Sequence, residues 1–544
     1  MVYSGIKSSL PDIVAPKHSD LPAFFFSRVR QNPAFTDSSG SQALRPLYID
    51  GDDPSATLTL NTAEALTNRL AAGLYHNAGV RPGHVVAIVM PNSVYYLPIA
   101  LAVLTLGATC TLANPAYTSR ELSHQLSDSQ ARLVITVTAL HPLVTEAAEP
   151  NVPILLADSD SMNKLLDTRS IFDLRSNRDF PRPDATHQAP AFIPYSSGTT
   201  GLPKGVKLSH GNIIANILQI TAVHQTSTCR PTSIAVLPMF HSFGLTFLCF
   251  VMPISGVTTV ISRKFDMTQF LSLVKQHQVT ETMLVPPIIN ALTKLPPKTL
   301  TDCLQSLRWV VVGAAPLSSE SIATLESIAT LESLLPELSI LQGYGLTETS
   351  PAVSLNPPTA SNVRSVGRIL PSIEAKVVDD IGRTLDSNEI GELCFRGPNI
   401  MLGYLNNDEA TKETIDVDGY LHTGDVGYID DQQHIYVTDR KKELIKYNGF
   451  QVAPAELEGI ILQHPEVRDC AVKGVFDLQR QTEVPKAYLV LTDPDQNDPA
   501  AAAQRVVEWV NNQVAYYKQL RGGYVLVNSI PRNTSGKILR RLLE

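Results

Sequence analysis

The sequence is poor in cysteine, and the few cysteines it has are scattered. Six occur among 544 residues, at positions 110, 229, 249, 303, 394 and 470, and none forms a C-x-x-C pair. This spacing indicates neither a disulfide framework nor a zinc site. A reducing compartment fits such a chain best, so we expect a cytoplasmic protein.

The sequence also lacks an excess of positive charge. Lys and Arg number 44 against 52 Asp and Glu, which gives a net charge of −8. A protein that binds nucleic acid usually presents a basic surface, so we expect no nucleic-acid partner. Apolar residues make up 44% of the chain and charged residues 18%, as in folded globular proteins. Any phosphate ligand must therefore be held by local basic groups.

Signals for export or membrane insertion are missing too. Residues 1–16 have no apolar core behind a basic start, and the end Arg-Arg-Leu-Leu-Glu is not an S-K-L-type peroxisomal address. Residues 85–119 and 231–262 lack Asp, Glu, Lys and Arg and are long enough to span a bilayer. Both stretches are broken by Pro, Asn and Gly, and neither has one-sided basic flanks. We expect buried βα units and no membrane span.

The order of the predicted elements suggests the fold class. The chain is too long for one core. Buried strands are predicted at 85–90, 133–137, 233–237, 282–286 and 309–312, with helices at 21–32, 62–77 and 213–220. Such alternation predicts α/β architecture with two doubly wound α/β lobes. From residue 373 short strands predict a small β-rich lobe. We place a boundary near 439–443, which separates a large N-terminal domain (1–439) from a small α+β C-terminal domain (440–544).

One stretch has the composition of a phosphate-binding loop. Residues 195–205 read Tyr-Ser-Ser-Gly-Thr-Thr-Gly-Leu-Pro-Lys-Gly. Glycines let the backbone approach an anion, successive N–H groups form an anion-binding nest, and Lys204 adds a positive charge. The pattern is not the G-x-x-x-x-G-K-[ST] loop, because Gly205 follows the lysine. It suggests triphosphate binding on another scaffold, and a mobile linker is the alternative. The candidate ligands are Ser196, Ser197, Gly198, Thr199, Thr200, Gly201 and Lys204.

Four further candidate positions follow predicted strands or lie near the chain's end. Glu348, in Gln-Gly-Tyr-Gly-Leu-Thr-Glu-Thr, can hold Mg²⁺, and the alternative there is a turn before a helix capped by Thr347. Asp425 can accept hydrogen bonds from ribose hydroxyls. His241, among aromatic residues, is either functional or a packed core residue. Near the C-terminus, Lys537 supplies a second cation beside Gly and Ser.

Five motifs in one order resemble a known superfamily. YSSGTTGLPKG, QGYGLTE, YLHTGD, DRKKELIKYNGFQVAP and PRNTSGKILRR follow one another along nearly the whole chain. The chain is thus similar to the adenylate-forming enzymes, which include acyl-CoA synthetases, 4-coumarate–CoA ligases and firefly luciferase. The resemblance implies an active site between a large domain and a small mobile domain, with a hinge near Lys442. It also implies ATP, Mg²⁺ and CoA as ligands.

The resemblance further implies roles for individual residues. At the nucleotide it implies Thr347 and Glu348 for the phosphates and Mg²⁺, and Asp425 and Arg440 for the ribose. Facing adenine it implies Gly313, Ala314, Ala315 and Tyr344, and it adds Gln342, Gly343 and Gly345 as further ATP- and AMP-binding residues. His241 would gate an acyl pocket lined by Phe240, Phe243, Gly313, Gly343, Gly345, Pro351 and Ala352. Lys537 would catalyse adenylation, and Lys446, Gly449 and Gln451 would face CoA in the second step.

The predicted function is that of an ATP-dependent acyl-CoA ligase. It would convert an apolar carboxylic acid, aromatic or fatty, into an acyl adenylate with release of pyrophosphate, and then transfer the acyl group to CoA. One alternative is an acyl-AMP ligase of secondary metabolism that loads the pantetheine thiol of a carrier protein. A second alternative, a non-catalytic nucleotide-binding protein, should lack Lys537, Glu348 or Asp425, and all three are present.

A short internal repeat stands apart from these motifs. Residues 321–326 and 327–332 are identical copies of Ser-Ile-Ala-Thr-Leu-Glu. We interpret them as a small tandem duplication within a surface helix. Six residues turn a helix by about 600°, so the second copy faces about 120° away from the first.

Overall fold

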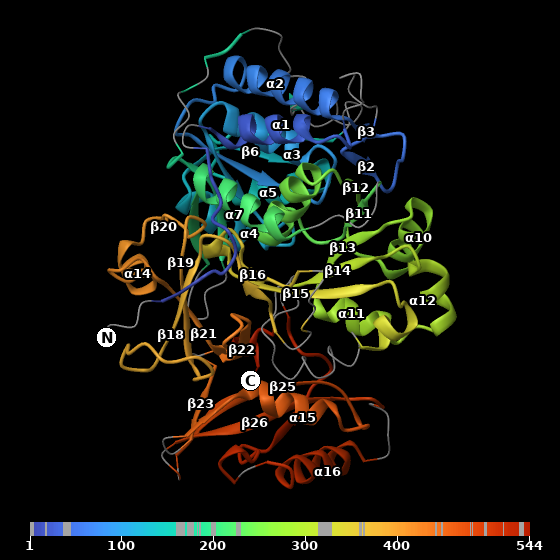
Figure 1. The fold of residues 1–544 in the computed structure, drawn as a ribbon, viewed down its shortest axis with the longest axis vertical. Coiled ribbons are helices and arrows are strands. Elements are labelled where there is room, and N and C mark those ends of the chain that lie inside the picture. The colour runs from blue at the N-terminus through green and yellow to red at the C-terminus, as the bar shows by residue number, and fades with distance from the viewer. Residues whose placement is uncertain are drawn as a thin grey trace.

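The structure is a computed structural model of the full chain. It describes residues 5–16, 19–35, 45–158, 169–170, 179–181, 183, 187–196, 203–224, 230–313, 329–357, 362, 365–440, 443–447, 450–478, 480, 482–493, 498–514, 516–532 and 538–543. Figure 1 shows most of the chain as a broad body, with the C-terminal elements β25, β26, α15 and α16 gathered below it.

The first α/β lobe is built on an eight-stranded sheet. Its strands, in order, are β20 (Gly403–Tyr404), β10 (Lys204–Ser209), β9 (Pro190–Ser196), β5 (Thr109–Leu112), β4 (Val85–Val89), β6 (Ala131–Thr136), β7 (Ile154–Leu156) and β8 (Arg169–Ser170). All strands from β9 to β8 are parallel. Central parallel strands are covered on both faces and so need continuous apolar sequence.

Helices cover both faces of this sheet. In β4, Val86 and Ile88 belong to the main core with α2 (Leu60–His76) and α3 (Tyr96–Thr105). The alternate residues Ala87 and Val89 belong to a second cluster with α4 (Ser119–Asp128) and α5 (His141–Ala147). The prediction of a doubly wound lobe is therefore confirmed.

The second α/β lobe is built on a nine-stranded sheet. Its strands, in order, are β17 (Arg368–Ile369), β16 (Ala352–Leu355), β15 (Ser339–Gly345), β14 (Trp309–Val312), β13 (Glu281–Leu284), β11 (Thr232–Ala235), β12 (Thr258–Ile261), β2 (Tyr48–Asp50) and β3 (Thr57–Leu58). Helices α10 (Met267–His277), α11 (Pro286–Leu292) and α12 (Pro297–Leu304) lie beside it (Figure 1). Strands β2 and β3 come from the start of the chain, which sequence order did not predict.

The predicted β-rich lobe is a five-stranded antiparallel sheet. Its order is β1 (Ile6–Lys7), β18 (Glu374–Val378), β19 (Gly391–Arg396), β21 (Leu421–Ile429) and β22 (Ile435–Arg440). The small α+β part follows with a hairpin of β23 (Ile445–Tyr447) and β24 (Phe450–Val452), and with β25 (Val467–Asp477), β26 (Thr482–Leu491), β27 (Tyr524–Leu526), α15 (Pro454–Leu462) and α16 (Pro499–Asn511). This part has a hydrophobic core of its own.

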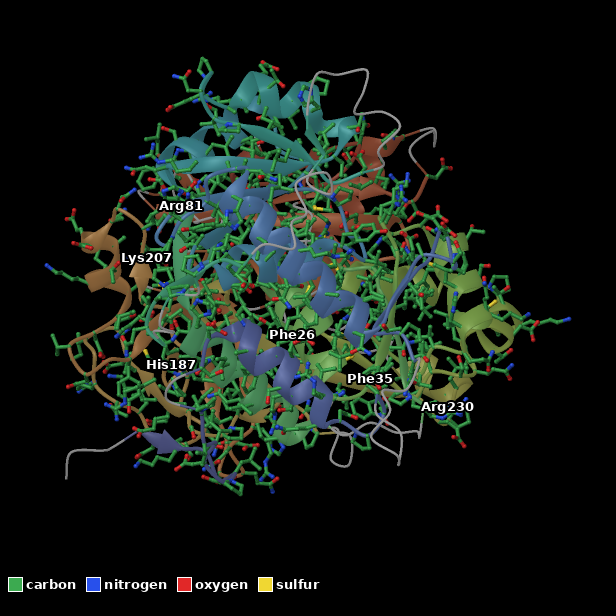
Figure 2. The ribbon with its side chains drawn as sticks, turned by 90° about the horizontal axis from the view of Figure 1, so that it is seen from above. Phe26, Phe35, Arg81, His187, Lys207 and Arg230 are labelled. Carbon is green, nitrogen blue, oxygen red and sulfur yellow. The ribbon has the colours of Figure 1, made fainter. Side chains whose placement is uncertain are left out.

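The uncharged stretches form buried elements. Residues 242–254 make one continuous helical segment, α8 (Ser242–Gly244), a π-helix (Leu245–Val251) and α9 (Met252–Ile254), and the π-helix is buried throughout. Over it lies α1 (Leu21–Gln31), which carries Phe26, with Phe35 beyond its end (Figure 2). Across the part of the chain that is described, no helix combines the length and the hydropathy needed to cross a membrane.

The duplicated hexapeptide is only partly described. Residues 321–328 lie outside the described residues, and 329–334 are helical. Leu331 and Leu335 are 2% and 5% exposed, and the Glu332 carboxylate accepts a hydrogen bond from Ile340 N at 2.9 Å. The helix of the second copy is therefore not a free surface helix, because one face packs on the core beside β15.

Candidate active site

The predicted phosphate loop closes a β-hairpin. Ser196, at the end of β9, pairs with Lys204, at the start of antiparallel β10, and residues 197–202 between them lie outside the described residues. The predicted helix follows only after β10, as α7 (His210–Val223), whose N-terminus Ser209 caps through Asn212 N. The loop therefore joins two strands, whereas the sequence had suggested a strand leading into a helix.

Glu348 lies beside the entrance of this loop. Its Oε1 accepts hydrogen bonds from Ser196 Oγ and from the Tyr404 hydroxyl, both at 3.0 Å. The carboxylate is buried, with a residue exposure of 7%. Thr347 is the first residue of a single 3-10 turn (Thr347–Thr349) before β16 and does not cap a helix, so the alternative of a turn followed by a helix capped by Thr347 is wrong. Thr347 Oγ1 is 3.5 Å from the hydroxyl of Ser242, the neighbour of His241.

Tyr404 is a residue of this site that the sequence did not reveal. It lies in β20, which pairs with β10 through Val206, immediately beyond the phosphate loop. Burial, followed by the nearby charge of Glu348, raises the pKa of Tyr404, so its hydroxyl stays protonated and donates. Lys204 Nζ lies 4.9 Å from the centre of the Tyr404 ring, a cation–π distance. Tyr404 thus touches both the predicted metal ligand and the predicted phosphate lysine.

Buried amides fix the turn that presents Glu348. Asn399 Nδ2 donates to Thr349 O at 2.8 Å and to Ala352 O at 3.1 Å, and Ser350 Oγ donates back to Asn399 O. Asn216, on α7, donates to the same Ala352 carbonyl at 2.7 Å. Breaking the hydrogen bonds of a buried amide destabilises the fold, so this network holds the turn in one conformation.

Asp425 lies on β21 and faces β15. Its Oδ2 accepts a 2.6 Å hydrogen bond from the Tyr344 hydroxyl, and the residue is fully buried. Asp425 is also the register partner of Arg440 on β22. The structure therefore brings Tyr344, Asp425 and the backbone of Arg440 together, as a common nucleotide site requires. Gln342, in the same β15, is the register partner of Val312, which precedes Gly313.

Some of the predicted acyl-pocket residues contact one another, and two of the glycines among them have different roles. A Cβ on Gly313 would lie 3.4 Å from the Phe243 ring, so Gly313 leaves room beside that ring. A Cβ on Gly345 would lie 1.8 Å from Pro351 O, so this glycine allows close contact between the chain segments. His241 Nδ1 accepts a hydrogen bond from Phe243 N, and burial lowers the pKa of His241 to about 4. The imidazole is therefore neutral at pH 7.

Several predicted residues cannot be placed. Ser197, Gly198, Thr199, Thr200, Gly201, Ala314, Ala315, Lys442, Gly449 and Lys537 lie outside the described residues. In the second-step motif, Lys446 of β23 and Gln451 of β24 are register partners. Their assigned roles stay predictions.

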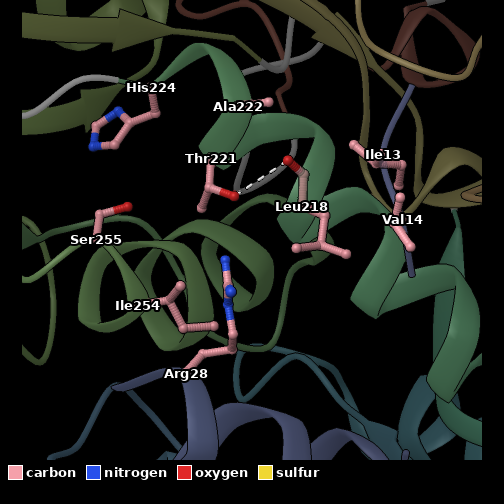
Figure 3. Close-up of a pocket in the computed structure, with 9 residues that line it drawn as sticks. All are labelled: Ile13, Val14, Arg28, Leu218, Thr221, Ala222, His224, Ile254 and Ser255. Carbon is pink, nitrogen blue, oxygen red and sulfur yellow. Dashed lines mark hydrogen bonds between the residues drawn. The ribbon is translucent and has the colours of Figure 1, made fainter. Parts of the chain in front are cut away.

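A separate pocket of about 620 Å³ lies near α1, α7 and α9 (Figure 3). It is lined by Ile13, Val14, Arg28, Leu218, Thr221, Ala222, His224, Ile254 and Ser255. None of these is a predicted site residue, so this hollow is not the predicted acyl pocket.

The donor set suits a magnesium ion carried by a nucleotide. No group of three or more His, Cys, Asp or Glu side chains among the described residues could hold a metal ion. Mg²⁺ commonly binds through one or two carboxylates together with substrate phosphates and water. Glu348, with Oε1 held by two hydroxyls, fits such a site without further protein ligands.

Comparison with known proteins agrees with this geometry. The family model for AMP-binding enzymes matches residues 35–405, and that for the AMP-binding enzyme C-terminal domain matches residues 456–537. The chain belongs to the AMP-binding enzyme family. A 4-coumarate-CoA ligase 1 of Narcissus pseudonarcissus is 36% identical over 99% of this chain and 95% of that protein. A probable 4-coumarate–CoA ligase 3 of Dictyostelium discoideum is 36% identical over 99% and 97%.

Solved structures of the family share the fold. ATP-bound MatB from Rhodopseudomonas palustris has a TM-score of 0.82 at 27% identity, over 96% of this chain and 98% of that one. O-succinylbenzoate Coenzyme A synthetase from Bacillus subtilis, in complex with ATP and magnesium ion, has a TM-score of 0.77 at 27% identity, with the same coverage. The family and its relatives confirm the predicted class, an AMP-forming acid–thiol ligase that uses ATP and CoA.

Proposed function

We propose that the chain activates an apolar monocarboxylic acid, aromatic or fatty, as its acyl adenylate and transfers the acyl group to CoA. One observation carries the proposal: Glu348, which accepts hydrogen bonds from Ser196 and Tyr404, joins the phosphate-loop hairpin to the turn that follows β15. The contact between Tyr344 and Asp425 then joins β15 to the β-rich lobe. One nucleotide can lie across these contacts.

The first step needs positive charge because both reactants are anions. The acid's carboxylate oxygen attacks the α-phosphorus of ATP, the bond from that phosphorus to the bridging oxygen breaks, and pyrophosphate leaves. Lys204 and Lys537 would stabilise the negative charge that is shared in the transition state. Glu348 and Thr347 would hold Mg²⁺, which neutralises phosphate charge when bound. Asp425 would orient the ribose.

The acid is expected to carry a single charge. None of the predicted pocket residues is charged at pH 7, since His241 is neutral and the others are apolar or glycine. A second carboxylate buried there would lack a partner, at a large cost in free energy. The Phe243 ring packs edge-on against Phe247 at 5.0 Å, beside Gly313, which favours a flat or slender apolar group. The curated relatives named 4-coumarate–CoA ligases support an aromatic acid.

The second step requires a different face of the C-terminal part. We place the domain boundary at residue 440 and the hinge near Lys442. A hydrophobic core within residues 445–520 supports movement of this part as a unit. Rotation would withdraw Lys537 and present Lys446, Gly449 and Gln451 to CoA. Lys537→Ala should then abolish adenylation yet spare thioester formation from supplied acyl adenylate, and Lys446→Ala should do the reverse. Equal loss in both half-reactions would contradict this division.

Pyrophosphate release over a panel of acids tests the function. The panel should contain hydroxycinnamates, benzoates, medium-chain and long-chain fatty acids, and dicarboxylates such as malonate, each with and without CoA. We expect turnover with apolar monocarboxylates and a thioester product only when CoA is present. Best turnover with a dicarboxylate would contradict the acid class. Adenylate formation with no thioester on CoA would favour a carrier-protein thiol as the acceptor.

A further inference from the structure

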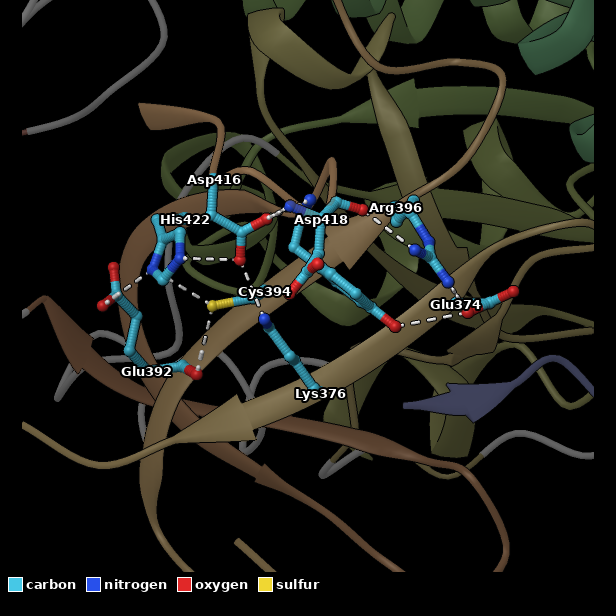
Figure 4. A network of polar contacts seen from close by, with 9 residues as sticks. Glu374, Lys376, Glu392, Cys394, Arg396, Asp416, Asp418 and His422 are labelled. Carbon is cyan, nitrogen blue, oxygen red and sulfur yellow. Dashed lines mark hydrogen bonds and ion pairs between the residues drawn. The ribbon is translucent and has the colours of Figure 1, made fainter. Parts of the chain in front are cut away.

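We propose that Glu392 is a positioning residue for nucleotide binding, because it braces the irregular stretch of β21 that presents Asp425. Glu392 lies on the neighbouring strand β19 and carries no role in the proposed reaction. The inference rests on the proposed role of Asp425 at the ribose. Figure 4 shows Glu392 and His422 among the polar side chains of this sheet.

The ladder between β19 and β21 is interrupted immediately before Asp425. Glu392 pairs with Val426 and Cys394 pairs with His422, so Leu393 alone faces residues 423–425. Gly424 adopts a φ of +69°, in the left-handed region that favours glycine. A bulge of this kind redirects side chains and removes regular ladder hydrogen bonds. Something other than the ladder must therefore hold the stretch.

Both carboxylate oxygens of Glu392 contact this stretch and stabilise it. Oε1 accepts a hydrogen bond from Gly424 N at 3.0 Å, and Oε2 lies 3.4 Å from His422 Nδ1. The carboxylate thus contacts the residue before the bulge and the residue at its centre. Thr423 adds a second tie, since its hydroxyl donates to Leu393 O at 2.8 Å and accepts from Asp425 N at 3.0 Å.

The other ring nitrogen of His422 is also in contact with a carboxylate. Its Nε2 lies 3.4 Å from Asp416 Oδ2, and the same carboxylate oxygen binds Lys376 Nζ at 2.8 Å. Cys394 Sγ lies 3.4 Å from His422 Nδ1 (Figure 4). A chain of contacts therefore runs from β18 through Asp416 and His422 to Glu392 and the backbone of Gly424.

The consequence concerns where Asp425 points. Its carboxylate is buried and meets the Tyr344 hydroxyl at 2.6 Å, which a shift of about 1 Å would break. Without the Glu392 carboxylate, Gly424 N loses its acceptor, and glycine gives this stretch other backbone conformations. We therefore expect loss of Glu392 to weaken ATP binding selectively, while the acyl pocket, formed by other elements, stays intact.

The test compares Glu392→Ala, Glu392→Gln, Asp425→Ala and the double variant in the full-length enzyme. Glu392→Ala should raise the KM for ATP about ten-fold and weaken direct AMP binding equally, a loss typical of one hydrogen bond to a charged group. The KM for the acid should change less than two-fold. Glu392→Gln should recover most of the loss, because the amide oxygen can still accept from Gly424 N. Glu374→Ala is the matched control, since Glu374 bonds Arg396 and Tyr420 in the same sheet and does not contact the bulge.

The double variant separates positioning from general destabilisation. If Glu392 acts through Asp425, Glu392→Ala should add little once Asp425 is alanine. Additive losses, or equal losses for ATP and the acid with a lowered melting temperature, would overturn the proposal. If Asp425→Ala alone leaves ATP binding unchanged, the proposed ribose site is wrong. If Asp425→Ala weakens ATP binding and Glu392→Ala does not, only the brace is wrong.

Discussion

The two buried carboxylates of the candidate site are held in different ways. Glu348 and Asp425 each accept a hydrogen bond from a tyrosine hydroxyl, Tyr404 and Tyr344 respectively. Every described side-chain partner of Glu348 comes from another sheet, the eight-stranded one. The segment of Asp425 is instead braced within its own sheet by Glu392. The proposed phosphate region thus depends on how the lobes pack, and the proposed ribose region depends on a local irregularity in one ladder.

Among changes at the two carboxylates and their contacts, the largest effect should follow from Glu348→Gln. The amide can still accept from Ser196 and Tyr404, so packing between the lobes should persist, but the negative charge at the predicted magnesium site is lost. We expect adenylation to fall by about 10²–10³-fold, as when one preorganised electrostatic contact to the transition state is removed. Pyrophosphate release measured against Mg²⁺ concentration checks this. A melting temperature like that of the wild type would show that the charge, and not the fold, was lost.

The two tyrosines allow the comparison itself to be tested. Tyr404→Phe keeps the ring beneath Lys204 and removes one of the two hydroxyls on Glu348. Losing that bond should lower kcat for adenylation about ten-fold. Tyr344→Phe should instead raise the KM for ATP by a similar factor, because its hydroxyl meets Asp425. If both variants change the same kinetic constant, the two regions are not separable.

Much of this site could be predicted from local sequence. Ser196, Glu348 and Asp425 lie in short motifs of glycines, hydroxyls and carboxylates beside strands, and such motifs are visible without the fold. Element bounds were predictable where the apolar pattern is strong, as in β14 (Trp309–Val312) and α15 (Pro454–Leu462). In these segments, burial on both faces or a proline at the first helical turn sets the structure locally.

The remainder depends on pairing between distant segments. Tyr404 reaches Glu348 only because β20 adds to the edge of a sheet whose other strands end by residue 209. Strands β2 and β3 complete a sheet formed otherwise from residues 232–369. Edge pairings of this kind leave no periodic signal in the short strands that make them. A lone tyrosine or glutamate therefore gave no sign that it contacts a motif residue.

A smaller effect is expected on the pH dependence of stability, through His422. This residue contacts Glu392 and so belongs to the Asp425 side of the comparison. Hydrogen bonding to Glu392, followed by its charge and by the contact with Asp416, raises the pKa of His422 above its ordinary value. A raised folded-state pKa means that the protonated imidazole stabilises the fold. This contribution is complete below about pH 6.5, the unfolded pKa, and is lost as the pH rises through the folded pKa.

The free energy of unfolding of the wild type should therefore exceed that of His422→Gln by the largest amount at pH 6. The difference should shrink towards pH 9. Denaturant titrations of both proteins at several pH values measure it. A difference that stays constant with pH would mean that His422 acts only through hydrogen bonds of its neutral ring. Lys376→Met removes the second cation that binds Asp416 Oδ2 and is a useful companion, because the pKa of His422 should then rise only slightly above its wild-type value if Glu392 dominates.

The smallest effect is expected from the duplicated hexapeptide, which lies in the chain between Gly313 and Gln342. Its second copy is not a free insertion, since Leu331 is 2% exposed and Glu332 binds Ile340 N at 2.9 Å. The copies are identical, however, so deletion of residues 327–332 places Leu325 and Glu326 in front of the same following sequence and can restore both contacts. The change in length then falls within residues 314–328, and loop-closure entropy depends only weakly on length. We expect the deletion protein to keep adenylation within a few-fold and its melting temperature within about 3 °C.

Leu331→Ala in the full-length chain is the matched contrast, because a cavity at a buried leucine should cost about 2–5 kcal/mol. Loss of ATP binding or of solubility on deletion would mean that both copies are needed to carry the chain from β14 to β15.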